Sequence, residues 1–230
     1  MNESNSFPIK IIVVGSINVG KTSLVTKYAT GKTPGKTETT KNASYVEKMK
    51  IVNGIKFQIK LWDTAGQEKY KSLTKLFIKD SQIAILVYSI DNEQSFNDLS
   101  SWFDLVKNSN DTNIFYGIAA NKSDLASENT IPDEIGKEYA KKIGAEWRLT
   151  SALVEGRGIE EYIDALFIKY YSSNFKMTET GSAAGSLSIT LSTENTRIEK
   201  KTCCGGSKTD DSNNNKKHRK RDDSKRTKKQ

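Results

Sequence analysis

The chain has few of the residues that disulfide-stabilised, zinc-binding and membrane-spanning proteins need. Its only cysteines are the adjacent pair Cys203 and Cys204, too few for a disulfide framework or a zinc site. The N-terminus has no charged-then-apolar signal pattern, and no run approaches the roughly 18 apolar residues of a membrane span. The single histidine, His218, is more simply interpreted as a solvated tail residue than as a catalytic or metal-binding one. We therefore expect a protein that is made and kept in the cytosol, a reducing compartment.

Large apolar residues are also scarce after Tyr171, and this scarcity divides the chain. Before it, runs such as IKIIVVG and QIAILVYSI recur and are long enough to bury a core. The segment 172–230 consists mainly of Ser, Thr, Asn, Gly and Lys, which cannot offset the entropy lost on ordering. We predict one folded domain over residues 1–171 and a disordered basic tail over residues 172–230.

The positive charge belongs mostly to that tail. The whole chain carries +8, and residues 205–230 contain 10 Lys and Arg against 4 Asp, a net +6, which leaves +2 for the rest. The charge therefore gives no argument for a nucleic-acid surface on the folded domain. The tail run KKHRKR fits either attraction to an anionic membrane or a nuclear localisation sequence.

Short apolar runs alternate with segments of helical period, which is typical of an α/β fold with a mainly parallel sheet. Asn53-Gly54 favours a type I′ hairpin, so the two strands that it joins should form the one antiparallel pair. Asp91 or Asn92 can cap the third helix, and Pro132 suits the first turn of the fourth. We predict six strands near 9–15, 43–52, 55–63, 82–90, 113–120 and 145–150, and five flanking helices near 20–29, 68–78, 93–107, 132–142 and 157–171.

A phosphate-binding motif follows the first strand. Residues 15–22, GSINVGKT, match G-x-x-x-x-G-K-[ST] between that strand and a helix. In such a loop backbone N–H groups surround phosphates, Lys21 faces the β- and γ-phosphates, and Thr22 offers a hydroxyl to Mg²⁺. The residues expected to contact a nucleotide here are Gly15, Ile17, Asn18, Val19, Gly20, Lys21, Thr22 and Ser23.

A second motif, Asp63-Thr64-Ala65-Gly66, follows the third strand. The Asp63 carboxylate can hold Mg²⁺ through water, and the N–H of Gly66 can face the γ-phosphate. Gln67 comes next and can orient an attacking water for in-line hydrolysis. Gln67 and Lys21 are therefore the predicted catalytic residues.

Two further motifs end the fifth and sixth strands, where open α/β sheets expose their ligand crevice. In Asn121-Lys122-Ser123-Asp124 the Asp124 carboxylate can accept from both N1–H and the exocyclic amine of guanine, which adenine cannot offer. After the sixth strand, Ser151-Ala152-Leu153 could close the base pocket through backbone N–H groups. Taken singly, the first motif could equally be a polar loop and the second a helix cap. Together they predict a guanine-binding site formed by Asn121, Lys122, Asp124, Leu125, Ser151, Ala152 and Leu153.

The series GSINVGKT, WDTAGQEKY, VYSIDNEQSF, NKSD and SAL resembles the Rab family of small GTPases over about residues 8–171. The resemblance implies a P-loop NTPase G domain and a GDP/GTP cycle run by exchange factors and GTPase-activating proteins. It also implies effectors that bind the switch regions and a role in vesicle traffic. It further implies that a switch-loop threonine binds Mg²⁺. Thr40 has the family spacing, 18 residues after Thr22 and 23 before Asp63, and its neighbour Thr39 is the alternative.

The chain departs from the family at one position of the phosphate loop and at two positions of the first switch loop. Ile17 stands where the family usually has Gly or Ser, and a rigid β-branched side chain there should crowd Gln67 and slow hydrolysis. The alternative is that the loop shifts slightly and tolerates isoleucine. Thr33 occupies the position of an aromatic residue that lies edge-on to guanine, so GDP should leave faster. Asn42 replaces a glycine, which makes an effector assignment by analogy unsafe.

The tail departs from the family as well. Rab proteins end in one or two lipidated cysteines, whereas 26 residues follow Cys204. Three alternatives remain open: lipidation of Cys203 and Cys204, membrane attraction by the basic run alone, or two inert thiols. We expect a cytoplasmic monomer that is peripheral on the cytosolic face of an endomembrane or the plasma membrane.

The predicted function is a GTP-binding switch with slow GTP hydrolysis and Mg²⁺ as cofactor. The alternative is a GTP-loaded interaction module that hardly hydrolyses because of Ile17. Nucleic-acid binding through the tail is a third possibility and is disfavoured.

Overall fold

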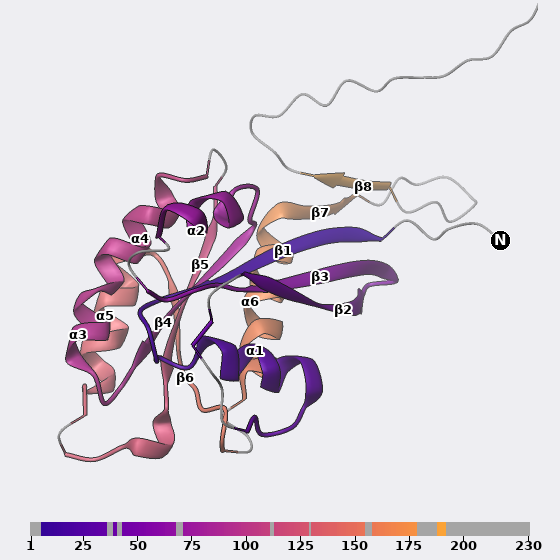
Figure 1. The fold of residues 1–230 in the computed structure, drawn as a ribbon. Coiled ribbons are helices and arrows are strands. Elements are labelled where there is room, and N and C mark those ends of the chain that lie inside the picture. The colour runs from indigo at the N-terminus through magenta and orange to yellow at the C-terminus, as the bar shows by residue number, and fades with distance from the viewer. Residues whose placement is uncertain are drawn as a thin grey trace, which may run out of the picture. The chain divides into compact units, whose positions relative to one another are not determined.

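A six-stranded sheet lies between two layers of helices in the computed structural model (Figure 1). Its strand order is β2-β3-β1-β4-β5-β6, with β2 and β3 antiparallel and the other neighbours parallel. The predicted α/β fold class is therefore confirmed. The structure describes residues 6–35, 39–40, 43–67, 71–110, 113–128, 130–154, 158–178 and 188–191.

The six strands begin and end within two residues of their predicted positions. The hairpin between β2 and β3 turns at Asn53 and Gly54, whose φ angles of 50° and 77° are both positive as a type I′ turn requires. The bounds of the strands are β1 Phe7–Val14, β2 Ser44–Val52, β3 Ile55–Asp63, β4 Ile83–Ser89, β5 Phe115–Asn121 and β6 Glu146–Leu149.

Both faces of the central strands are buried, because helices cover the sheet on both sides. Along β1, Ile11 packs in one core with α1 and α6, while its neighbour Ile12 packs in the other with α2, α4 and α5. Phe167 of α6 and Trp102 of α4 are large, fully buried members of the two cores. This two-sided burial explains why β1 and β4 read as continuous apolar runs.

The helices begin and end within three residues of their predicted positions, and two details differ from prediction. The predicted helix over 93–107 is divided at Asp98 into α3 and α4, and Asn92 caps it by accepting a hydrogen bond from the N–H of Ser95. Pro132 precedes α5 in an extended conformation instead of lying within its first turn. The bounds are α1 Lys21–Thr30, α2 Lys71–Ile78, α3 Glu93–Asn97, α4 Leu99–Lys107, the 3₁₀ helix η2 Ser123–Leu125, α5 Asp133–Ile143 and α6 Ile159–Asn174.

The segment predicted to be disordered contains some described structure. Helix α6 runs to Asn174, and two short strands, β7 Phe175–Thr178 and β8 Ser188–Leu191, pair antiparallel. Their sequences FKMT and SITL hold β-branched and large apolar residues that favour strands. Cys203, Cys204 and the rest of the tail lie outside the described residues, so the domain boundary at 171 and the disordered tail stay predictions. No helix in the described part is long and apolar enough to span a membrane.

Candidate functional site

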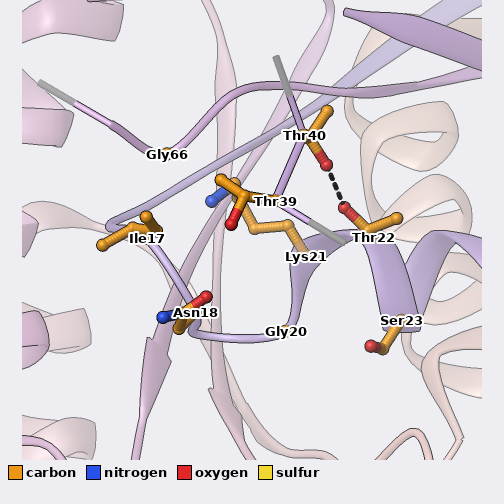
Figure 2. A pocket seen from close by; sticks show the side chains of 9 residues that line it. All are labelled: Ile17, Asn18, Gly20, Lys21, Thr22, Ser23, Thr39, Thr40 and Gly66. Carbon is orange, nitrogen blue, oxygen red and sulfur yellow. Dashed lines mark hydrogen bonds between the residues drawn. The ribbon is translucent and has the colours of Figure 1, made fainter. Parts of the chain in front are cut away.

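The predicted motifs meet at one edge of the sheet, because they follow the carboxyl ends of β1, β3, β5 and β6. A pocket lies there between the phosphate loop, the segment 39–40 and the end of β3 (Figure 2). It is lined by Ile17, Asn18, Gly20, Lys21, Thr22, Ser23, Thr39, Thr40 and Gly66.

Lys21 is buried beside this pocket. Its Nζ donates hydrogen bonds to the carbonyl oxygens of Gly15 and Ser16, at 2.9 and 2.8 Å, so the loop bends around the ammonium group. Gly66 approaches from the other side, and a Cβ built on it would lie 2.2 Å from Lys21 Nζ and 2.6 Å from the Ser16 oxygen. Only glycine fits there, which brings the end of β3 against the phosphate loop.

Three side-chain oxygens converge next to the lysine. The hydroxyl oxygens of Thr22 and Thr40 are hydrogen-bonded at 2.6 Å (Figure 2). Thr22 also donates to Asp63 Oδ2 at 2.7 Å, and Thr40 lies 3.4 Å from the same oxygen. Asp63 Oδ1 is buried and has no hydrogen-bond partner.

Burial raises the pKa of the Asp63 carboxyl, and hydrogen bonds from Thr22 and the charge of Lys21 oppose that rise. A buried carboxylate oxygen without a partner is costly unless something else, such as a cation, contacts it. No group of three or more His, Cys, Asp or Glu side chains in the described part could hold a metal ion. The donors here are instead one carboxylate and two hydroxyls, hard oxygen ligands that suit Mg²⁺ when phosphate and water oxygens complete the shell.

The fifth-strand motif is joined directly to the phosphate loop. Asn121 is 1% exposed, and its Nδ2 donates to the carbonyl oxygen of the buried Val19 at 2.7 Å. A Cβ built on Gly20 would lie 2.4 Å from that same Nδ2, so the loop and Asn121 are in close contact. Thr150 donates to Asn121 Oδ1 at 3.3 Å and ties in the end of β6. Asn121 thus connects β1, β5 and β6.

The other residues of the predicted guanine site surround an exposed carboxylate. Asp124 is solvent-exposed, and Ser151 Oγ donates to its Oδ1. The same Ser151 oxygen accepts from the N–H groups of Leu153 and Val154, which fixes the loop after β6. Ala152 is buried, Lys122 is half-buried, and Leu125 and Leu153 are exposed. The arrangement presents one carboxylate oxygen and two aliphatic side chains beside the phosphate loop.

The model of the Ras family matches residues 10–172 of this chain. The chain belongs to the Ras family.

Several Rab proteins of this family are similar to the chain. Ras-related protein Rab-21 from Geodia cydonium is 39% identical over 152 residues, which are 66% of each chain. Rab-21 from Bos taurus is 36% identical over 156 residues, 68% of this chain and 70% of the relative. Ras-related protein Rab-5A from Dictyostelium discoideum is 29% identical over 205 residues, 88% of this chain and 100% of the relative.

The comparisons confirm the predicted Rab-like member of the Ras superfamily, a GTP-binding switch that hydrolyses GTP and takes part in vesicle traffic. They do not favour the alternative of a GTP-loaded module with little hydrolysis. The chain spans about two thirds of the length of the Rab-21 relatives.

The departures from the Ras family are placed differently around the pocket. Ile17 is half-buried and lines the pocket (Figure 2). It directly follows Ser16, whose carbonyl oxygen lies against Gly66. Gln67 is half-buried and follows Gly66, but it is not among the nine lining residues. Thr33 is exposed, and Asn42 lies outside the described residues.

Sequence reasoning missed two residues that shape this Ras-family site. Ser16 is an unspecified position of the motif, and only the structure identifies its carbonyl as a partner of Lys21. Thr150 stands directly before the predicted Ser151, and its contact with Asn121 crosses from one strand to the next. For the threonine left open between 39 and 40, Thr40 contacts Thr22 and Asp63, while Thr39 lines the pocket.

Proposed function

We propose that the pocket binds the phosphates of a guanine nucleotide and that Thr22, Thr40 and Asp63 hold its Mg²⁺. The observation that carries this proposal is the convergence of the three oxygens beside the unpartnered Asp63 Oδ1. Bound there, Mg²⁺ would neutralise charge on the β- and γ-phosphates. Lys21 supplies a second positive charge, and the amides of residues 15–20 supply N–H donors at the start of α1.

Guanine is recognised by Asp124, whose carboxylate accepts from N1–H and the exocyclic amine. The Ser151 contact supports this role, because it orients the carboxylate while leaving Asp124 exposed to a ligand. Leu125 and Leu153 can cover the faces and edge of the base. Lys122 lies beside Asp91, at 3.9 Å between Nζ and Oδ1, and its aliphatic stem can pack on the ring.

Hydrolysis depends on Gln67 and Lys21. Gln67 orients the attacking water, and Lys21 stabilises the charge that develops on the transferred phosphoryl group. We expect the reaction to be slow, because the half-buried Ile17 lines the pocket that the glutamine must reach. With GTP bound, Thr40 and the loop after Asp63 are ordered, and hydrolysis releases them.

Effectors bind the surface beside these two loops. Tyr45, Trp62 and Phe77 form a continuous aromatic cluster, with ring centroids 4.8 and 5.7 Å apart. Leu73 and Leu76 of α2 are 51% and 72% exposed and extend the apolar area. Trp and Tyr are enriched among the few residues that supply most of the binding energy in protein interfaces. Exchange factors and GTPase-activating proteins use the same switch loops.

The protein is cytoplasmic and attaches peripherally to the cytosolic face of an endomembrane or the plasma membrane. The basic tail and Cys203 and Cys204 carry this part of the proposal, because charge and lipid together bind membranes more stably than either alone. Flotation with liposomes that contain or lack phosphatidylserine tests it, with tail-deleted protein as the control. Equal flotation of the tail-deleted protein would exclude the tail.

The deciding experiment identifies the nucleotide that co-purifies with the full chain and follows its conversion with time. We expect bound GDP, a strong preference for GTP over ATP, and loss of that preference in Asp124→Ala. Removal of Mg²⁺ with EDTA should speed GDP release from the native chain and have a smaller effect on Thr22→Ala. Equal binding of adenosine and guanosine nucleotides in the presence of Mg²⁺ would overturn the proposal.

A further inference from the structure

The side chain of Ser16 makes a buried contact outside the phosphate pocket. Ser16 lies between Gly15 and Ile17 and is 6% exposed. Its Oγ donates to Asp98 Oδ2 at 2.7 Å and accepts from Trp102 Nε1 at 3.2 Å. The hydroxyl is thus held by the region where α3 ends and α4 begins, 82 residues further along the chain.

Asp98 is well suited to fix that hydroxyl. It is the single residue between α3 and α4, with a helical backbone (φ −71°, ψ −14°). Its second oxygen, Oδ1, accepts from Gln94 Nε2 at 2.8 Å, so both carboxylate oxygens are engaged and the group has one orientation. Trp102 is fully buried four residues later, which anchors the other partner of Ser16 in the core.

The backbone of Ser16 belongs to the phosphate pocket. Its carbonyl oxygen accepts from Lys21 Nζ at 2.8 Å and lies against Gly66, where an added Cβ would be only 2.6 Å away. Movement of this one peptide would displace the lysine, the wall at Gly66 and the neighbouring Ile17 together. A side-chain anchor on Ser16 therefore fixes the point where the loop leaves β1.

We propose that Asp98 is a positioning residue for nucleotide binding, which acts through Ser16 to hold the phosphate loop in its binding shape. The inference rests on the proposed function of the pocket. Hydrogen bonds to a charged group are stronger than those between neutral groups, and a buried hydroxyl that loses its acceptor bears a further cost. If that cost falls on the nucleotide-binding shape of the loop, loss of the anchor accelerates GDP release about tenfold.

The test is a double-mutant cycle on the full chain, with release of a fluorescent GDP analogue as the readout. We expect Ser16→Ala and Asp98→Ala each to release it about tenfold faster than the native chain. The double variant should be no faster than the faster single one, because both substitutions remove the same contact. Asp98→Asn keeps a neutral acceptor oxygen for Ser16, so its release rate should lie between those of the native chain and Asp98→Ala.

The matched control is Asp104→Ala. Asp104 is an exposed aspartate of α4, the helix that Asp98 directly precedes, so its removal changes the charge of this region without touching the phosphate loop. We expect it to release the analogue at the native rate. Three results would each overturn the inference: Asp104→Ala releases the analogue as fast as Asp98→Ala, Asp98→Asn releases it as fast as Asp98→Ala, or the effects of the two single substitutions add in the double variant.

Thermal unfolding of each variant separates positioning from general stability. If Asp98→Ala unfolds at lower temperature but releases the analogue at the native rate, Asp98 is merely structural and the inference fails. These results leave the proposed function standing, since the native chain still binds the analogue. If the native chain itself binds no guanine nucleotide, the proposed function fails first.

Discussion

Asn121 is the residue whose substitution tests the architecture of the site most directly. Its Nδ2 donates to the carbonyl oxygen of Val19 at 2.7 Å, and both residues are 1% exposed. In Asn121→Ala the Val19 oxygen loses this donor in a place that water hardly reaches. Leaving a buried polar group without a partner costs about 1–3 kcal/mol. If the whole cost appears as lost nucleotide affinity, GDP binds roughly 5- to 140-fold more weakly.

Asn121→Asp should be worse than Asn121→Ala. A carboxylate is nearly the same size as the amide, but it cannot donate and would place a negative oxygen against the Val19 carbonyl. The Thr150 hydroxyl, 3.3 Å from Oδ1, can still donate to the aspartate, so the comparison of Asn121→Asp with the native chain isolates the Val19 contact.

The assay is the rate of GDP release, measured with a fluorescent analogue alongside thermal unfolding. Asn113→Ala is the control, because Asn113 is an exposed asparagine just before the same strand. We expect Asn121→Asp to release GDP fastest and Asn121→Ala more slowly. The control and the native chain should share the slowest rate. An aspartate variant that releases GDP no faster than the alanine variant would refute the reasoning.

Three further predictions concern the pocket wall, the switch loop and the core. Ile17→Gly should raise the single-turnover rate of GTP hydrolysis, because the half-buried isoleucine lines the pocket beside the Gly66 contact; an unchanged rate counts against this account. Thr33→Phe should slow GDP release by adding an aromatic wall for guanine, and release as fast as from the native chain would contradict it. Gly117→Ala should lower the free energy of unfolding by about 1–3 kcal/mol, measured by chemical denaturation, because a Cβ there would lie 2.5 Å from Tyr162 Oη; a native-like midpoint would show that α6 shifts freely.

The central sheet and the phosphate loop could be predicted because their signals are local. The type I′ turn needs two consecutive residues of positive φ, and the dipeptide Asn53-Gly54 alone meets this requirement, because Asn and Gly adopt such angles readily. The phosphate motif likewise specifies a glycine at position 20, where a side chain would collide with Asn121. The Mg²⁺-binding threonine was predicted through the resemblance to the Rab family and left open between Thr40 and Thr39. In the structure the Thr40 hydroxyl lies near both Thr22 and Asp63.

What could not be predicted depends on residues distant in sequence. The division between α3 and α4 was missed because Asp98 keeps helical backbone angles, so the apolar period continues across it. The partners of Ser16 lie 82 and 86 residues away, and a motif gives no information on such contacts. The strands β7 and β8 are four residues each, too short for an alternating pattern to stand out.

Strand β2 is an edge strand of the six-stranded sheet, and its sequence bears on how the protein avoids self-association. Lys48 and Lys50 pair with Glu160 and Asp164 of α6, which fixes two cations along the outermost strand. Lysines on an edge strand disfavour pairing with a strand of another molecule, because the added strand would have to accommodate their charge. Met49 and Ile51 occupy the alternate positions of β2 and are 58% and 64% exposed. Without the lysines, an edge strand with such exposed apolar side chains would favour pairing with another chain. The lysines therefore oppose edge-to-edge association of β2 with a second chain, while Met49 and Ile51 stay exposed to solvent.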